Sequence, residues 1–94
     1  MAYVFVEHKI GEWLEFENIF RADTARRQKL GSKGCRVFRN PDDPSNVFVV
    51  FEWGDLDGAR QFATGLEAHE AREWATSGIW SIVNVAEQVL EMEA

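Results

Sequence analysis

The sequence predicts an α+β domain in which four antiparallel strands form one sheet and two helices cover one of its faces. Two observations lead to this fold class. Alternating apolar and polar residues, which are typical of strands, recur in four segments, and apolar residues at helical spacing occur in two others. The resulting order is strand, helix, strand, strand, helix, strand. Two right-handed crossovers on one sheet then give a ferredoxin-like arrangement, with residues 1–94 forming a single domain.

A strand and a long helix are predicted first. Residues 2–10 alternate between apolar and polar side chains, which is the period of a strand. One face of this strand carries Val4, Val6, His8 and Ile10. Between residues 12 and 30, apolar residues instead recur at helical spacing, starting with Trp13 and Phe16. Gly31 is a typical residue for a helix end, so we expect this helix to stop there.

A hairpin, a second helix and a last strand are predicted in the rest of the chain. Residues 33–39 and 47–53 have the pattern of strands, and the segment NPDDPSN between them is rich in turn residues. Asp55 stands where a helix N-cap is expected, and helical spacing continues from there to about residue 76. Residues 80–91 alternate once more and form the last predicted strand.

Charge and composition exclude several functional classes. The 94 residues carry 16 acidic and 10 basic side chains, and the net charge of −6 opposes binding to nucleic-acid phosphates. The sequence contains neither a run of 18 apolar residues nor a basic leader with an apolar core, so we expect a cytoplasmic protein that is not a membrane protein. Cys35 is the only cysteine and is expected to be a buried thiol. Two histidines without a second cysteine give no zinc-site spacing, so we expect no metal.

The second face of the predicted sheet is also largely apolar. Its residues include Tyr3, Phe5, Phe38, Phe48 and Val50. Two helices can cover only one face, and an uncovered apolar face of this size is an association surface. We therefore expect a homodimer in which a second copy of the chain covers this face.

Three stretches of the sequence carry a family resemblance that spans essentially the whole chain. They are VFVEHKIGEW at residues 4–13, the hairpin RVFRNPDD with NVFVVFEWGDL, and FATGLEAHEAREW at residues 62–74. Together they resemble the dimeric α/β-barrel superfamily, especially its antibiotic-biosynthesis-monooxygenase-like branch. The resemblance implies that two sheets pair into an eight-stranded barrel and that a small-molecule cavity lies between each sheet and its own helices. It also implies chemistry without a cofactor, such as oxygenation or cyclisation of aromatic polyketides, or else haem degradation.

His8 is the first candidate catalytic residue. Its place in the alternation puts it on the helix-covered face, and the following helix should bring Trp13 and Phe16 back over it. We place Trp53 at the same end of the sheet. A histidine among aromatic side chains favours its neutral form, which suits a general base near pH 7. The alternative is that His8 is a packed structural residue, because a single histidine on an apolar strand face commonly is.

Arg27 and His69 are further candidates. Asp23 and Arg27 lie within the apolar stripe of the first helix at a spacing that favours a mutual ion pair. If a ligand carboxylate or phenolate enters from that end, Arg27 would meet it. In cyclase-like relatives a histidine follows an aromatic residue in the second helix, and FATGLEAH resembles this arrangement, with His69 as the histidine. The alternative for His69 is a helix-surface histidine between two glutamates.

Aromatic side chains are the candidate walls of a substrate cavity. Together with Arg27, the predicted substrate-binding residues are Trp13, Phe51, Trp53, Phe62, Trp74 and Trp80. The alternative for each tryptophan is that it fills a small core or a dimer interface.

The leading functional prediction is an enzyme of aromatic or secondary metabolism that needs no cofactor, of the monooxygenase or polyketide-cyclase type. It would act on a small hydrophobic or aromatic ligand, with His8 or His69 removing a proton. The alternatives are a ligand-binding or stress-related dimer without catalysis and, third, a haem-binding or haem-degrading protein. The haem prediction ranks last because the first strand lacks the asparagine of such relatives, and because His69 and Trp74 diverge on a continuous helix.

Overall fold

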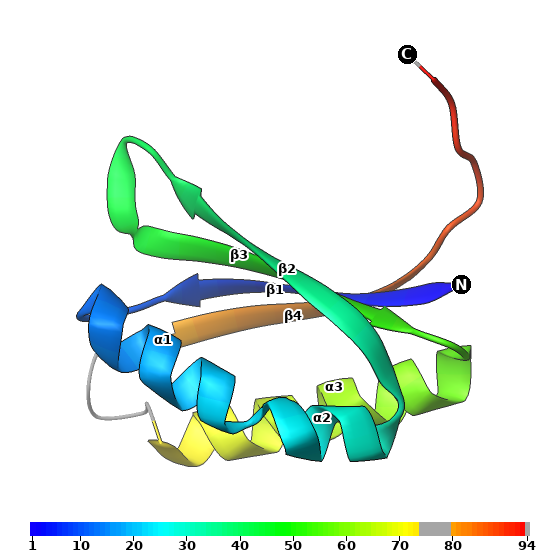
Figure 1. The fold of residues 1–94 in the computed structure, drawn as a ribbon, viewed down its shortest axis with the longest axis horizontal. Helices are drawn as coiled ribbons and strands as arrows, with labels where there is room; N and C mark the ends of the chain where they lie inside the picture. The colour runs from blue at the N-terminus through cyan, green and yellow to red at the C-terminus, as the bar shows by residue number, and fades with distance from the viewer. Residues whose placement is uncertain (74–79, 94) are drawn as a thin grey trace.

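Seven elements form the described part of the chain. The computed structural model describes the backbone of residues 1–73 and 80–93, and the side chains of residues 1–66 and 82–93. In chain order the elements are β1 (Ala2–Lys9), α1 (Trp13–Ala22), α2 (Thr24–Leu30), β2 (Ser32–Asn40), β3 (Asp43–Trp53), α3 (Leu56–Glu73) and β4 (Trp80–Glu87). The strands form one antiparallel sheet in the order β2-β3-β1-β4. Figure 1 shows α1, α2 and α3 on one face of this sheet, which confirms the predicted ferredoxin-like α+β fold.

The first predicted helix is divided in two, which corrects the prediction of one helix over residues 12–30. The break is at Asp23, whose φ of −90° and ψ of 0° lie outside the helical range. The Asp23 N–H donates to the carbonyl of Phe20, three residues back, and the Thr24 hydroxyl donates to the carbonyl of Arg21 at 2.8 Å. The Thr24 hydroxyl is a short polar group of the kind that competes with helical hydrogen bonds. Helix α2 starts again from this point in a new direction (Figure 1).

Two other boundaries differ from prediction. The turn-rich segment 40–46 is mostly strand, because the turn is made by Pro41 and Asp42 alone and Asn40 pairs with Asp43. The Asn40 side chain accepts the Asp42 N–H at 2.9 Å, which favours this tight turn. The last strand ends at Glu87 and does not reach residue 91. The predicted N-cap of α3 is confirmed, since Asp55 accepts the Gly58 N–H at 2.5 Å, whereas the predicted end near residue 76 lies outside the described residues.

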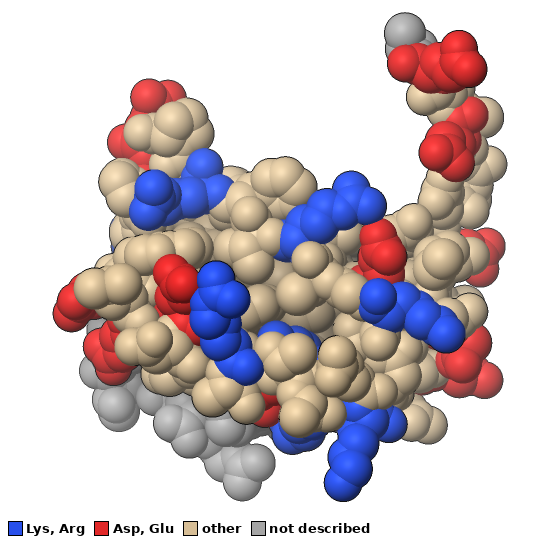
Figure 2. All heavy atoms as spheres, in the orientation of Figure 1, with Lys and Arg blue, Asp and Glu red and all other residues tan. Residues whose placement is uncertain are grey.

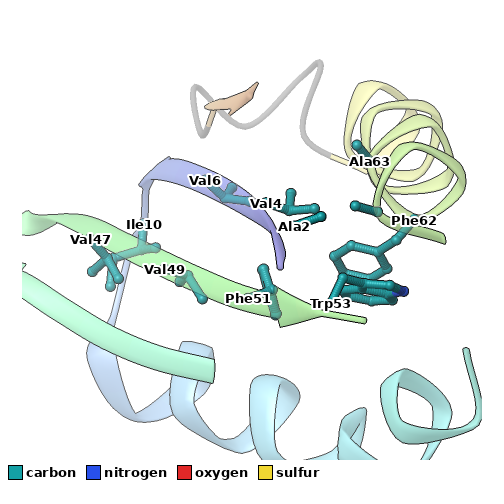
Figure 3. Packing of buried hydrophobic residues seen from close by; sticks show 11 residues of the cluster. Ala2, Val4, Val6, Ile10, Val47, Val49, Phe51, Trp53, Phe62 and Ala63 are labelled. Carbon is teal, nitrogen blue, oxygen red and sulfur yellow. The ribbon is translucent and has the colours of Figure 1, made fainter. Parts of the chain in front are cut away.

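The core lies between the sheet and the helices. Because side chains alternate along a strand, every second residue of β1 from Ala2 to His8 and of β3 from Val47 to Trp53 points to the helices and is almost fully buried. Together with His8, these residues are Ala2, Val4, Val6, Val47, Val49, Phe51 and Trp53. Figure 3 shows Phe62 and Ala63 extending from α3 toward this row. The strand phases predicted from the sequence are therefore confirmed.

Trp53 is the largest fully buried side chain among the described residues. Its side chain is 1% exposed, and its ring stacks on Phe62 with 4.5 Å between centroids (Figure 3). A Cβ added at Gly58 would lie 2.7 Å from the indole, and one added at Gly31 would lie 3.3 Å from it. Gly31 also has a φ of +111°, which favours glycine, so two glycines make room for one tryptophan.

The other face of the sheet is uncovered in the single chain. Four large apolar side chains are exposed there, namely Phe5, Phe38, Phe48 and Ile82. In Figure 1 the C-terminal segment that follows β4 rises from the sheet on this side. Within the part of the chain that the structure describes, no helix has both the length and the apolar character needed to cross a membrane.

Candidate functional site

A cavity with a volume of about 350 Å³ lies between α1, α2 and β2. Figure 2 looks onto this face, which is hollowed near its middle and has basic side chains around the hollow. The volume is at the lower end of the range typical of small-molecule sites. Strand β2 is at the edge of the sheet and has no strand beyond it. The helix-facing side of β2 is therefore only partly covered by α1 and α2, and the cavity lies between these three elements.

Three aromatic rings on α1 form the apolar wall of the cavity. Trp13, Phe16 and Phe20 are spaced at three and four residues, so they share one face of the helix. The centroids of Trp13 and Phe16 are 5.7 Å apart, and Phe16 stacks on Phe20 at 5.6 Å. The Trp13 Nε1–H donates to Glu17 at 3.0 Å, which holds the indole in the cavity lining. A flat apolar ligand fits against such a wall.

Arg27 contributes a buried positive charge to the cavity lining. The residue is 5% exposed, and its guanidinium carbon lies 4.1 Å from the centre of the Phe20 ring. Its Nη2 donates to the carbonyl of Phe20 at 2.9 Å and to the Thr24 hydroxyl at 3.2 Å. Burial lowers the pKa of Arg27 from its ordinary value. The break at Asp23 separates the two helices around this side chain, so Arg27 reaches the cavity from α2.

The predicted pair of Asp23 and Arg27 is present only as a longer contact. The closest approach of the two groups is 3.7 Å. Arg26 instead donates to both carboxylate oxygens of Asp23, at 2.7 Å each. The helix break explains the difference, because Asp23 lies at the start of α2 and its carboxylate is partly exposed, where Arg26 can reach it.

His8 lies beside the cavity but does not line it. Its ring is 5.5 Å from that of Phe16, as the phase of β1 predicts, and Phe16 belongs to the cavity wall. The residue is 5% exposed, and desolvation by burial lowers its pKa from 6.5 to about 4. His8 is therefore neutral at pH 7 and has a ring nitrogen able to accept a proton.

Trp53 is not at the same end of the sheet as His8, which corrects the prediction. Antiparallel pairing sets His8 beside Val47 and Ala2 beside Trp53. Six residues of strand separate the two positions, which is roughly 20 Å. The prediction failed because both residues are near the carboxyl ends of their strands, and neighbouring antiparallel strands have those ends at opposite edges.

The other predicted substrate-binding residues are divided between core and cavity. Trp13 and Arg27 line the cavity, whereas Phe51, Trp53 and Phe62 do not. These three pack on one another, with 5.0 Å between the rings of Phe51 and Phe62. The side chains of His69, Trp74 and Trp80 lie outside the described residues.

Several cavity residues were not singled out from the sequence. Arg21, Lys33 and Phe20 line the cavity, and Phe20 belongs to the apolar stripe of the predicted first helix but was not named as a candidate site residue. Cys35 is exposed and lines the cavity, which corrects the prediction of a buried thiol. Cys35 is exposed because β2 is an edge strand. The residues of β2 do not reveal this position, because strand order is set by contacts between distant segments.

Comparisons with solved structures identify the fold. SnoaB, a cofactor-independent oxygenase from Streptomyces nogalater, is 20% identical, with a TM-score of 0.72 over 99% of this chain and 98% of SnoaB. A structure of an antibiotic biosynthesis monooxygenase is 17% identical, with a TM-score of 0.61 over 96% of this chain and all of the other. A dimeric ferredoxin-like protein from an uncultured marine organism is 11% identical, with a TM-score of 0.58 over 97% of each chain.

A search with family models found no match, and neither did a search of curated proteins. The structural likeness, at identities below 25%, establishes the fold. The chain has the ferredoxin-like fold of antibiotic-biosynthesis-monooxygenase-like proteins, and the resemblance predicted from its sequence is confirmed at that level.

Proposed function

We propose that the protein is an enzyme of aromatic or secondary metabolism that needs no cofactor, of the monooxygenase or cyclase type. The observation that carries this proposal is the cavity between α1, α2 and β2, with its aromatic wall and buried Arg27. The fold shared with SnoaB, a cofactor-independent oxygenase, supports the same class.

In this proposal the chain binds and orients a flat substrate and takes up a proton. The rings of Trp13, Phe16 and Phe20 hold the substrate and exclude water from it. In the oxygenase form, loss of a proton makes a substrate anion, and that anion reacts with dioxygen. His8 is the candidate proton acceptor because it is neutral at pH 7 and its ring lies 5.5 Å from that of Phe16, a residue of the cavity wall. His69 remains the second candidate.

A ligand-binding dimer without catalysis is the alternative, and one observation favours it. Among the described residues that line the cavity, the only carboxylate is Glu17, and no histidine is present. Glu17 already accepts hydrogen bonds from Trp13 and Arg21. A catalytic base must therefore be a residue that packs behind the aromatic wall, such as His8, or a residue whose side chain is outside the described part, such as His69.

Blocking the cavity is expected to abolish activity. Val37 lines the cavity and is 36% exposed, so Val37→Trp fills the space at little cost in stability. We expect oxygen uptake with anthrone and 1,4-dihydroxynaphthalene, measured in the presence of EDTA, to fall by about tenfold or more in this variant. The matched control is Val85→Trp, because Val85 is also 36% exposed but lies on β4, away from the cavity lining.

Equal rates in the two tryptophan variants would contradict the proposed site. Binding of either compound without oxygen uptake or product formation would favour the alternative without catalysis. A Soret band that forms on mixing with haem and is lost in Val37→Trp would favour the third prediction, a haem-handling protein.

We also propose that the protein is a homodimer formed through the uncovered face of the sheet. Exposed Phe5, Phe38 and Phe48 support this, and so does the fold shared with a dimeric ferredoxin-like protein. We expect light scattering at micromolar concentration to give twice the chain mass of 10.8 kDa. Phe38→Asp is expected to give monomers, whereas Ile19→Asp, on the exposed side of α1, is expected to leave the dimer intact. A stable wild-type monomer would overturn this proposal.

A further inference from the structure

The cavity is basic although the chain as a whole is acidic. The sequence has a net charge of −6. The described charged residues that line the cavity are Arg21, Arg27, Lys33 and Glu17, which is three positive charges against one negative charge, or a local net charge of +2. Figure 2 shows basic side chains around the hollow. A concave surface with one sign of charge and low-dielectric walls attracts ligands of the opposite sign.

Arg27 is the centre of this charge because it is buried and only weakly neutralised. The carboxylate nearest to it among the described residues is that of Asp23, at 3.7 Å. Arg26 holds that carboxylate through two hydrogen bonds of 2.7 Å. The other partners of Arg27, the Phe20 carbonyl and the Thr24 hydroxyl, are neutral. A buried cation is costly unless an anion compensates it, so this position favours a negatively charged ligand.

The donors of Arg27 that remain define how such a ligand would bind. Both hydrogen bonds of Arg27 to described residues leave from Nη2, whereas Nη1 lies 3.7 Å from the Asp23 carboxylate. Nε and, in competition with Asp23, Nη1 can therefore donate to a ligand oxygen. The guanidinium lies against the Phe20 ring, which continues the aromatic wall from Trp13 through Phe16. An anionic oxygen at Arg27 therefore places the ligand's apolar body along this wall.

We propose that the cavity selects flat aromatic ligands that carry a single negatively charged oxygen, as a carboxylate or an ionised phenol, and that Arg27 is the residue that recognises it. This inference rests on the proposed function, because it assigns the charge of the ligand for the same site. Arg21 and Lys33 also line the cavity but are exposed, so water and salt weaken the attraction that they add.

The test compares 2-naphthoate with its neutral counterpart 2-naphthamide by calorimetry at low and moderate salt. We expect 2-naphthoate to bind about tenfold or more tightly, because a hydrogen bond to a charged group is worth about that factor. The dye 2,4-dinitro-1-naphtholate, measured in parallel, tells whether the accepted anion is a phenolate, a carboxylate or either.

Two variants outside the cavity lining test the role assigned to Arg27 without removing it. In Arg26→Gln, Asp23 is released to neutralise Arg27, so the preference for 2-naphthoate should fall to about threefold or less. In Asp23→Asn the nearest carboxylate is removed, so the preference should rise. Lys29→Gln is the matched control, because Lys29 is an exposed cation of the same helix outside the lining, and its preference should equal that of the wild type.

The outcomes separate the inference from the proposed function. If 2-naphthoate and 2-naphthamide bind equally well, the charge selection is overturned and the cavity stands as a ligand site. If neither compound nor the naphtholate binds, both the inference and the proposed site are overturned. A lower preference for 2-naphthoate in Arg26→Gln together with a higher preference in Asp23→Asn supports the inference. If Arg26→Gln and Lys29→Gln change the preference equally, the assignment to Arg27 is overturned.

Discussion

Replacing Trp53 with alanine is expected to lower the free energy of unfolding by about 3–5 kcal/mol. The indole is 1% exposed, stacks on Phe62 at 4.5 Å, and fills the space left by Gly31 and Gly58. Its removal leaves a cavity between β3 and α3 that those two glycines cannot fill. Urea unfolding followed by far-UV circular dichroism, at a fixed protein concentration, measures the loss.

Trp53→Phe is the control that separates volume from polarity. Within the described residues, the Trp53 Nε1–H is buried without a hydrogen-bond acceptor, which is itself unfavourable. Phenylalanine removes this donor and keeps most of the stacking, so its cost should be well under half that of alanine. A phenylalanine variant as unstable as the alanine variant would contradict this account. Ligand binding should survive in the folded phenylalanine variant, because Trp53 does not line the cavity.

Lowering the pH from 7 to 4 is expected to remove roughly 3 kcal/mol of stability through His8 alone. Burial lowers the pKa of His8 from 6.5 to about 4 in the folded chain. Below pH 6.5 the unfolded chain binds a proton at this residue, whereas the folded chain does so only near pH 4. The contribution of His8 to the free energy of unfolding is therefore complete above pH 6.5. It is lost as the pH falls from 6.5 to about 4, by about 1.4 kcal/mol for each pH unit.

The comparison with His8→Gln isolates this contribution. Carboxylates titrate over the same range in both proteins, so the difference between their urea midpoints at pH 7.0, 5.5 and 4.0 reports His8. We expect the wild type to lose stability faster than the variant across this range. Parallel curves would show that His8 is not desolvated in the folded protein. Turnover of the same variant at pH 7 then tests whether His8 is the base.

The sequence by itself determined the fold class, the strand phases and the position of His8 under the first helix. These features follow from local spacing, because a period of two residues fixes which side chains share a strand face. The contact of His8 with Phe16 is a consequence of that phase and of the short connection between β1 and α1. The uncovered apolar face was equally visible, because its residues are the other phase of the same strands.

The tertiary structure alone decided where the cavity lies and which residues line it. The break at Asp23, the capture of Asp23 by Arg26 and the burial of Arg27 depend on where α2 packs against β2. Antiparallel register placed Trp53 at the opposite end of the sheet from His8. The order of the strands left β2 at an edge and opened the cavity beside Cys35. Register and strand order arise from contacts between distant segments, and the local periodicity of a sequence does not record them.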